Sequence, residues 1–248
     1  LIDAAPNAPT LTSTPDLRVF ALSPASTGLL SALGAWPSAH AARVGACRRM
    51  RVWERDPDRG LVFDAATLGW SRLGSIVEHS ILQDALAQAS ARASLACRWG
   101  RRIATLDIDA EGVSLGFEDG DVVRTRLVVG VDGAASPVRQ LAGIESQSID
   151  YRQRGLVANV RTATPHAETA WQRFLPTGPL AFLPLADGAC SIVWSLPEAE
   201  AARLEQLPAD RFERELAVAA GGALGAIGLE SARASFPLKR QLAKSHTA

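Results

Sequence analysis

The feature that most constrains the fold is a short apolar segment that runs into an Asp-Gly pair and then into a helix start. Residues 127–131 (LVVGV) are rich in β-branched side chains, as is typical of a strand buried on both faces. Asp132 and Gly133 form a turn pair that a strand interior disfavours. Ser136 can cap a helix whose first residue is Pro137. The Asp132 carboxylate is therefore expected at the carboxyl end of a buried strand, where ligands bind in open α/β sheets.

Spacing alone leaves two interpretations of Asp132 open, because the acid either ties down a turn or holds a ligand. Residues 132–139 read DGAASPVR, which fits the pattern D-G-x-x-S-x-x-R after an apolar strand. This motif resembles the Asp-Gly fingerprint of the flavoprotein aromatic hydroxylases. The resemblance implies that Asp132 contacts an FAD cofactor.

Composition excludes several other classes of function. Lys+Arg and Asp+Glu both number 26, so no net charge recruits nucleic acid or an anionic membrane. The three cysteines are far apart and form no C-x-x-C pair, which indicates a reducing cytosol and no metal site. The uncharged, glycine-rich apolar run at residues 216–229 has 14 residues. A transmembrane helix needs about 20, so we expect no transmembrane segment.

The first residues are typical of the end of a strand. Asp3 follows Leu1 and Ile2, and in dinucleotide-binding folds an acid at such a place binds the adenosine ribose. A lone acid there is more often a solvated surface residue. No segment fits the glycine-rich pattern G-x-G-x-x-G. We therefore expect an internal piece of a longer chain, and a piece that binds flavin poorly by itself.

Residues 18–26 (RVFALSPAS) combine an extended run with a Ser-Pro helix start. Arg18 lies just ahead of this helix, whose N-terminus can help hold a pyrophosphate; the simpler interpretation is a solvated arginine. The segment resembles the FAD-dependent ring hydroxylases of ubiquinone biosynthesis. That resemblance implies that Arg18 approaches the flavin pyrophosphate and forms an ion pair with Asp132.

Residues 76–86 (IVEHSILQDAL) lead into a predicted helix from about residue 80 to 89. Ser80 and Gln83 match a capping box, S-x-x-Q, which accounts for Gln83 in structural terms. The segment also resembles the helix of the same hydroxylases whose glutamine contacts the flavin. Both roles for Gln83 stay open.

Residues 102–131 alternate in polarity between glycine turns, which predicts a β-meander. Within it, residues 112–116 match G-x-S-x-G, the nucleophile-elbow pattern of serine esterases. An elbow requires a strand-to-helix turn with the serine at its apex, whereas Ser114 is expected in the middle of a strand. A serine esterase is therefore only a remote alternative.

The second half of the chain changes character. Strand-like runs separated by Pro and Gly turns are followed by two helical segments, which predicts a second sheet of mixed or antiparallel strands. The strands are expected at 151–161, 170–175, 178–185 and 190–195, and the helices at 198–206 and 210–220. Residues 171–185 and 190–195 are similar to the same hydroxylases, which implies a substrate domain that covers the flavin ring.

The expected fold class is α/β, with a partial Rossmann-like FAD-binding domain that carries the meander and an α+β substrate domain. The FAD-binding domain is expected at residues 1–144 and the substrate domain at 145–236. Residues 45–75 are expected to contribute strands to the substrate domain, and residues 237–248 to begin a return to the FAD-binding domain. The resemblance covers nearly the whole chain but only the middle of the family's length.

The resemblance implies an FAD monooxygenase that uses NAD(P)H and O₂ to hydroxylate a phenol or quinol in ubiquinone biosynthesis. The flavin carries this chemistry, so no catalytic side chain is expected. The strand at 178–185 has no Arg or Lys. An unpaired buried carboxylate is costly, so we expect a neutral, prenylated substrate, with Leu183 and Leu185 on the pocket face.

The other alternative is a catalytically inactive fragment or scaffold subunit that keeps the sheet without the flavin. For the enzyme, we expect a cytoplasmic location with loose peripheral contact at the inner membrane. A protein complex of ubiquinone biosynthesis is the expected partner, because the substrate resides in the bilayer while the chain is balanced in charge.

Overall fold

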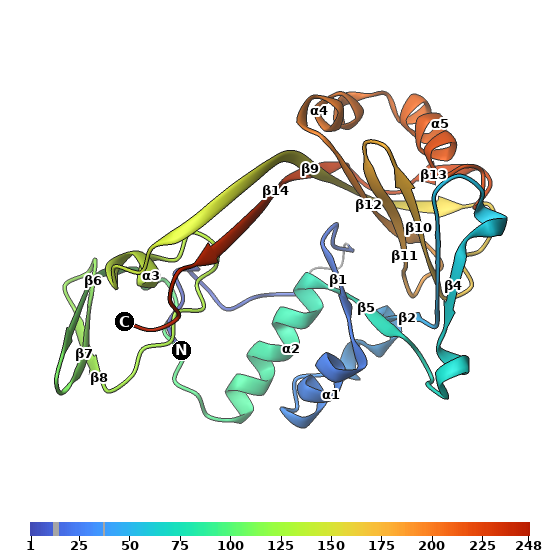
Figure 1. Ribbon diagram of the computed structural model, residues 1–248. Coiled ribbons are helices and arrows are strands. Elements are labelled where there is room, and N and C mark those ends of the chain that lie inside the picture. The colour runs from blue at the N-terminus through green and yellow to red at the C-terminus, as the bar shows by residue number, and fades with distance from the viewer. Residues whose placement is uncertain (12–14, 37) are drawn as a thin grey trace. The chain divides into compact units, whose positions relative to one another are not determined.

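The computed structural model describes residues 1–11, 15–36 and 38–248 and is drawn in Figure 1. The chain divides into two compact units. One unit comprises Leu1–Ala8, Ala93–Tyr151 and Lys239–Ala248, and the other comprises Pro9–Arg92 and Arg152–Leu238. Residues 9–92 thus pack with the strands of the second half of the chain.

The larger unit is built on an eight-stranded sheet with the order β13-β9-β12-β11-β10-β3-β4, in which β14 also pairs with β9. Its strands are β3 (Arg49–Trp53), β4 (Leu61–Asp64), β9 (Ser146–Thr162), β10 (Thr169–Leu175), β11 (Gly178–Pro184), β12 (Cys190–Pro197), β13 (Ile227–Leu229) and β14 (Ala234–Ala243). The β3–β10 pair is parallel, whereas β9, β12, β11 and β10 pair antiparallel. The predicted mixed sheet is confirmed.

Two helices, α4 (Glu198–Gln206) and α5 (Ala209–Ala219), cover one face of this sheet (Figure 1). Alternate residues of the central strands point toward them, including the fully buried Leu180, Phe182 and Ile192. Phe212 and Leu216 of α5 are buried against the same cluster. The period of two along each strand therefore builds the main core on this face.

A small antiparallel sheet with the order β1-β5-β2 belongs to the same unit. Its strands are β1 (Val19–Leu22), β2 (Gly45–Cys47) and β5 (Gly74–Glu78), and its helices are α1 (Pro24–Ala32) and α2 (His79–Arg92). Ser23 caps α1 as predicted, accepting a bond from the Ser26 N–H. Leu29 of α1 and Leu33 at its C-cap are each 62% exposed, and α1 has no buried residue.

A polar network joins the two sheets of this unit. The Glu78 carboxylate, 8% exposed, accepts bonds from Arg43 at 2.9 and 2.6 Å and from the Asp16 N–H at 2.7 Å. The Asp16 carboxylate in turn accepts from the Ser80 N–H at 2.5 Å, and its carbonyl accepts from the Asn159 amide at 3.3 Å. Asn159 lies on β9, so the network ties the first turn of α2 to the large sheet.

This network corrects the predicted capping box of α2. Ser80 is the second residue of the helix, and its buried hydroxyl has no hydrogen-bond partner among the described residues. Gln83 is exposed. The cap comes instead from Asp16, which is 64 residues earlier in the sequence. A local S-x-x-Q pattern could not predict a cap from so distant a residue.

The smaller unit contains a three-stranded antiparallel meander of β6 (Ile103–Asp109), β7 (Gly112–Phe117) and β8 (Val122–Thr125), followed by α3 (Pro137–Leu141). The first residues form a parallel bridge between Ile2 and Arg98. The predicted meander is confirmed up to Thr125.

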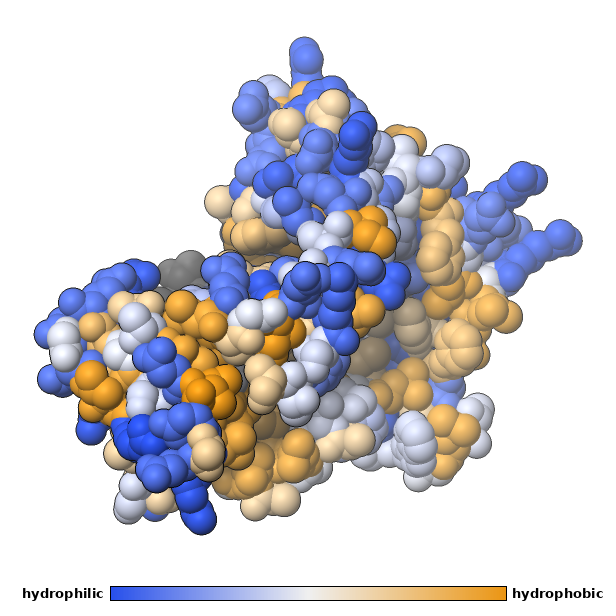
Figure 2. All heavy atoms as spheres, turned by 60° about the vertical axis from the view of Figure 1, so that its left-hand side comes forward, coloured by the Kyte–Doolittle hydropathy of each residue, from blue (hydrophilic) through white to orange (hydrophobic). Residues whose placement is uncertain are grey.

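The predicted strand at 127–131 is wrong. Leu127, Val129 and Val131 are 73%, 70% and 81% exposed, and no strand is assigned to this segment. Figure 2, in which the left-hand side of Figure 1 comes forward, shows apolar residues among the hydrophilic ones at the surface. A strand buried on both faces needs paired neighbours and covering layers, and within the described residues no strand pairs with this run.

No described helix combines the length and apolar character that crossing a membrane requires.

We predict that Glu78→Gln lowers the free energy of unfolding by about 2 to 3 kcal/mol, because it removes the buried carboxylate charge that pairs with the Arg43 guanidinium. Urea denaturation of the purified protein measures this loss. The matched control is Glu200→Gln, which breaks an exposed pair with Arg203 and is expected to cost less than about 1 kcal/mol. Equal costs for the two variants would contradict a structural role for Glu78.

Candidate functional site

The Asp-Gly turn forms the start of α3. The Asp132 carboxylate accepts a 3.0 Å bond from the Val138 N–H, and the Ser136 hydroxyl accepts a 3.0 Å bond from the Arg139 N–H. Gly133 has a φ of 83°, and a side chain added there would meet open space. A positive φ favours glycine. The predicted turn, Ser136 cap and first-turn proline are confirmed.

The same bonds keep Asp132 ionised. Partial burial by itself would raise the pKa of Asp132. Hydrogen bonds from Ser136 and the Val138 N–H, together with the Arg139 charge, outweigh it and hold the pKa below its ordinary value. The turn therefore presents a fixed negative charge at neutral pH.

A hollow of about 840 Å³ lies beside this turn. Its wall includes Asp132, Gly133 and Ser136. It also includes charged side chains of both signs: Arg126, Arg139, Asp109 and Glu111. Small-molecule sites commonly have volumes of roughly 300 to 1,000 Å³. Guanidinium groups pair with phosphates, a carboxylate accepts bonds from ribose or ribityl hydroxyls, and glycine lets a ligand approach the backbone. The residues present thus fit the polar part of a flavin dinucleotide.

Asp3 lies in the same unit and has a local role. Its carboxylate accepts a 2.8 Å bond from the Ala5 N–H, which closes a turn after the bridge to Arg98. Asp3 is exposed and does not line the 840 Å³ hollow. Its expected contact with the adenosine ribose stays a prediction.

Arg18 and Gln83 come from adjoining elements of the larger unit. The Arg18 carbonyl accepts a 3.0 Å bond from the N–H of His79, the first residue of α2, and Gln83 follows one turn later. The Arg18 guanidinium lies 5.3 Å from the centre of the Phe20 ring, and both Arg18 and Gln83 are exposed. The expected ion pair between Arg18 and Asp132 involves residues of two different units and stays a prediction.

Leu183 lies on β11 and Leu185 directly follows that strand, and both contact the same small cluster, as alternation along the chain predicts. Both are partly buried and pack with Cys47, Ile76 and Ala170, on the side away from α4 and α5. In this structure they belong to a small apolar cluster. Their contact with a substrate stays a prediction.

Two buried oxygens next to Leu183 were not found from the sequence. Leu183 pairs across strands with Ser191, which pairs with Asn159. The Ser191 hydroxyl and the Asn159 side-chain oxygen have no hydrogen-bond partner among the described residues. A buried polar oxygen costs free energy unless water or a ligand satisfies it. Only the register of β9, β11 and β12 brings these residues side by side.

His166 is another buried polar residue that the sequence patterns did not indicate. Its Nδ1 accepts a 3.1 Å bond from the Glu168 N–H, in a loop where Ala167 and Glu168 have φ values of 48° and 54°. Burial lowers the pKa of His166, against the opposing effects of the Leu185 carbonyl and the Asp187 and Glu168 carboxylates. The folded protein therefore holds this imidazole neutral.

The G-x-S-x-G segment does not form a nucleophile elbow. Ser114 lies inside β7, which continues through a hairpin into β8, and its hydroxyl accepts a 3.2 Å bond from Arg124. No helix follows at the point that an elbow requires. The structure therefore removes the support for a serine esterase.

The fold is similar to that of solved structures. The structure of P. aeruginosa PqsL in complex with 2-aminobenzoylacetate matches with a TM-score of 0.73 at 22% identity, covering 96% of this chain and 66% of that one. The flavin-dependent monooxygenase PieE in complex with FAD and substrate matches with a TM-score of 0.69 at 14% identity, covering 100% of this chain and 46% of that one. At these identities the likeness concerns the fold alone.

Sequence comparison gives the family. The family described as "FAD binding domain" matches residues 11–235, and the chain belongs to it. The chain is 36% identical to the 3-demethoxyubiquinol 3-hydroxylase of Escherichia coli (strain K12) over 92% of its own length and 58% of that protein. It is 36% identical to the mitochondrial ubiquinone biosynthesis monooxygenase COQ6 of Mus musculus over 82% of its length and 44% of that protein.

The chain thus spans about half the length of the curated relatives it matches. The predicted resemblance to the ring hydroxylases of ubiquinone biosynthesis is confirmed at the level of the family.

We predict that acid destabilises the protein through His166. An unfolded imidazole has a pKa of about 6.5, and the folded one is lower, so the unfolded state binds the proton first as the pH falls. Stability linked to His166 is therefore present above pH 6.5 and is lost as the pH drops below it. His166→Asn keeps an acceptor for the Glu168 N–H but cannot be charged.

The free energy of unfolding, measured by urea denaturation between pH 7.5 and 5.5, is expected to fall more steeply for the parent protein than for His166→Asn. A difference between the two proteins that stays constant over this range would contradict the role of His166.

Proposed function

We propose that the complete protein is an FAD-dependent monooxygenase that uses NAD(P)H and O₂ to hydroxylate an aromatic ring in ubiquinone biosynthesis. The observation that carries this proposal is membership of the FAD binding domain family, with 36% identity to a ubiquinol hydroxylase along most of the chain. FAD, when bound, supplies the redox chemistry and the activation of oxygen. The protein supplies binding, orientation and exclusion of water.

The residues proposed to hold FAD are Asp3, Arg18, Gln83 and Asp132. The formed Asp-Gly turn and the hollow beside it support Asp132, because its carboxylate is fixed by the Val138 N–H and remains ionised. The bond between the Arg18 carbonyl and the first residue of α2 supports a shared role for Arg18 and Gln83. We also propose an FAD-binding domain at 1–144 and a substrate domain at 145–236, with residues 45–75 contributing β3 and β4 to the large sheet of the substrate domain.

The proposed substrate is a neutral, prenylated phenol or quinol. Leu183 and Leu185 offer an apolar surface, and the strand that carries Leu183 has no cationic residue. Ser191 and Asn159 add two hydrogen-bonding oxygens beside Leu183, which suits a ring that carries hydroxyl groups. A carboxylate on this face would lack a cation from that strand, and its burial would be costly.

We place the enzyme in the cytoplasm, with loose contact at the inner membrane that depends on partner proteins of the pathway. Lys+Arg and Asp+Glu are equal in number, and Arg203 and Arg214 of the surface helices are paired with acids. Electrostatic capture by anionic lipid is therefore expected to be weak. Tight, salt-reversible sedimentation of the protein with anionic liposomes would contradict this placement.

Two substitutions of Asp132 separate a turn residue from a flavin ligand. Asp132→Asn keeps an oxygen that accepts the Val138 N–H bond but removes the charge, whereas Asp132→Ala removes both. If the Asp132 charge binds FAD, both variants of the complete protein are expected to bind FAD about tenfold or more weakly, because a charge-assisted hydrogen bond is lost. Flavin released from the purified variants, measured by absorbance, reports this loss.

Loss of FAD in Asp132→Ala alone, with normal occupancy in Asp132→Asn, would return Asp132 to a purely structural role. Arg18→Ala is expected to lower occupancy in the same direction. The double variant of Arg18 and Asp132 is expected to lose less than the sum of the single losses, because paired residues couple.

A further inference from the structure

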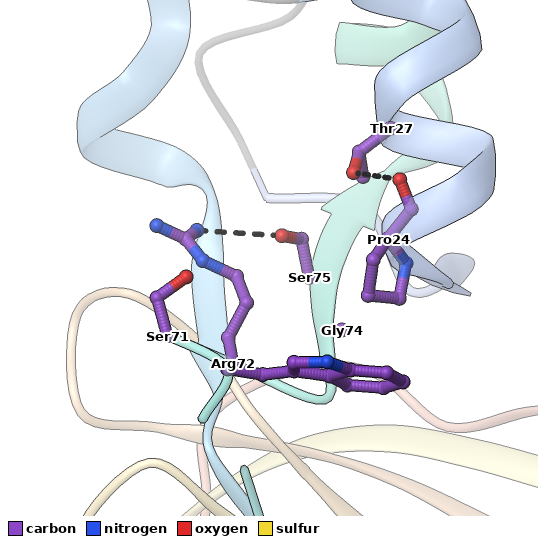
Figure 3. A pocket seen from close by; sticks show the side chains of 7 residues that line it. Pro24, Thr27, Ser71, Arg72, Gly74 and Ser75 are labelled. Carbon is purple, nitrogen blue, oxygen red and sulfur yellow. Dashed lines mark hydrogen bonds between the residues drawn. The ribbon is translucent and has the colours of Figure 1, made fainter. Parts of the chain in front are cut away.

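A second hollow, of about 300 Å³, lies in the larger unit between α1 and the start of β5. Trp70 and Arg72 lie on the loop that enters β5, and Ser75 lies on β5 itself. Pro24 and Thr27 of α1 form the other side (Figure 3). We propose that this hollow binds a small aromatic carboxylate, at a place separate from the residues assigned to FAD and to the phenol.

The Arg72 guanidinium is bonded to a buried residue of the small sheet. Its Nη1 donates a 3.4 Å bond to the Ser75 hydroxyl, drawn as a dashed line in Figure 3. Ser75 is 1% exposed and lies in the central strand of the small sheet, so this hydroxyl is a fixed support. A guanidinium carries five N–H donors, and this bond uses one. The remaining donors suit the two oxygens of a carboxylate.

Trp70 supplies the surface for an aromatic ring. It is 55% exposed although it is one of the largest apolar side chains of the protein. Its backbone N–H donates a 2.9 Å bond to the Ala65 carbonyl, which fixes the loop that carries it. Aromatic side chains favour stacked or edge-to-face contact with other rings. An exposed indole beside a supported guanidinium therefore presents a ring contact and an anion contact together.

Charge and size narrow the class of ligand. Among the described residues that line the hollow, Arg72 is the one charged side chain, and no acid offsets it. A volume of about 300 Å³ is at the lower end for small-molecule sites. It suits a single ring with one acidic group and is too small for a dinucleotide. The proposed ligand differs from the neutral substrate of the main reaction, so binding here is distinct from turnover.

The test is a titration of the purified protein with 4-hydroxybenzoate, followed by tryptophan fluorescence and by calorimetry. We expect saturable binding that weakens by about tenfold or more in Arg72→Gln, because a charge-assisted hydrogen bond is lost. Ser75→Ala is expected to weaken binding as well, because the guanidinium loses its support. Arg211→Gln, which changes an exposed arginine of α5, is the matched control and is expected to bind like the parent protein.

Two ligand controls complete the design. Benzamide keeps the ring without the charge, and inorganic phosphate keeps a negative charge without the ring; each is expected to bind at least about tenfold more weakly than 4-hydroxybenzoate. Undiminished binding to Arg72→Gln, equal binding of benzamide or phosphate, or no saturable binding would each overturn the proposal. The readout is binding alone, so it does not depend on flavin or on hydroxylation.

Discussion

The ion pair between Glu78 and Arg43 is the interaction on which the larger unit depends. The Glu78 carboxylate is almost fully buried at the junction of β5 and α2, where an unpaired charge would be costly. Arg43 binds both of its oxygens, and the Asp16 N–H binds one of them. Asp16 then caps α2 and contacts Asn159 of the large sheet. One buried acid thereby fixes a strand, a helix and a sheet.

This constraint bears directly on the proposed cofactor contacts. Arg18 lies two residues after Asp16 and directly precedes β1, and Gln83 lies on α2, whose first turn Asp16 caps. The turn at Asp132 is different, because its geometry is set within a few residues by the Val138 N–H and Ser136. Long-range bonds thus position the elements that carry Arg18 and Gln83, whereas bonds within a few residues position Asp132.

Local patterns predicted those parts of the fold that local physics decides. The helix at 198–206 formed as expected, because its Ala, Glu and Leu residues favour a helix. The Asp132 turn formed as expected, because turn chemistry and the Ser136 cap act over a few residues. Residues 127–131 failed as a strand, since β-branched composition cannot supply the neighbouring strands that bury it. Asp16 was not predicted for the same reason, because its role depends on a bond to Ser80, 64 residues away. His166 was not predicted because its burial depends on tertiary packing.

The central claim is that the complete protein inserts an oxygen atom from O₂ into an aromatic ring, and isotope labelling tests it most directly. The purified, FAD-loaded protein is supplied with NAD(P)H, ¹⁸O₂ and a prenylated phenol, and the product is analysed by mass spectrometry. The account predicts one ¹⁸O atom in the new hydroxyl group, with the prenylated phenol turned over in preference to a hydrophilic benzoate. Oxygen derived from water, or preference for the benzoate, would contradict it.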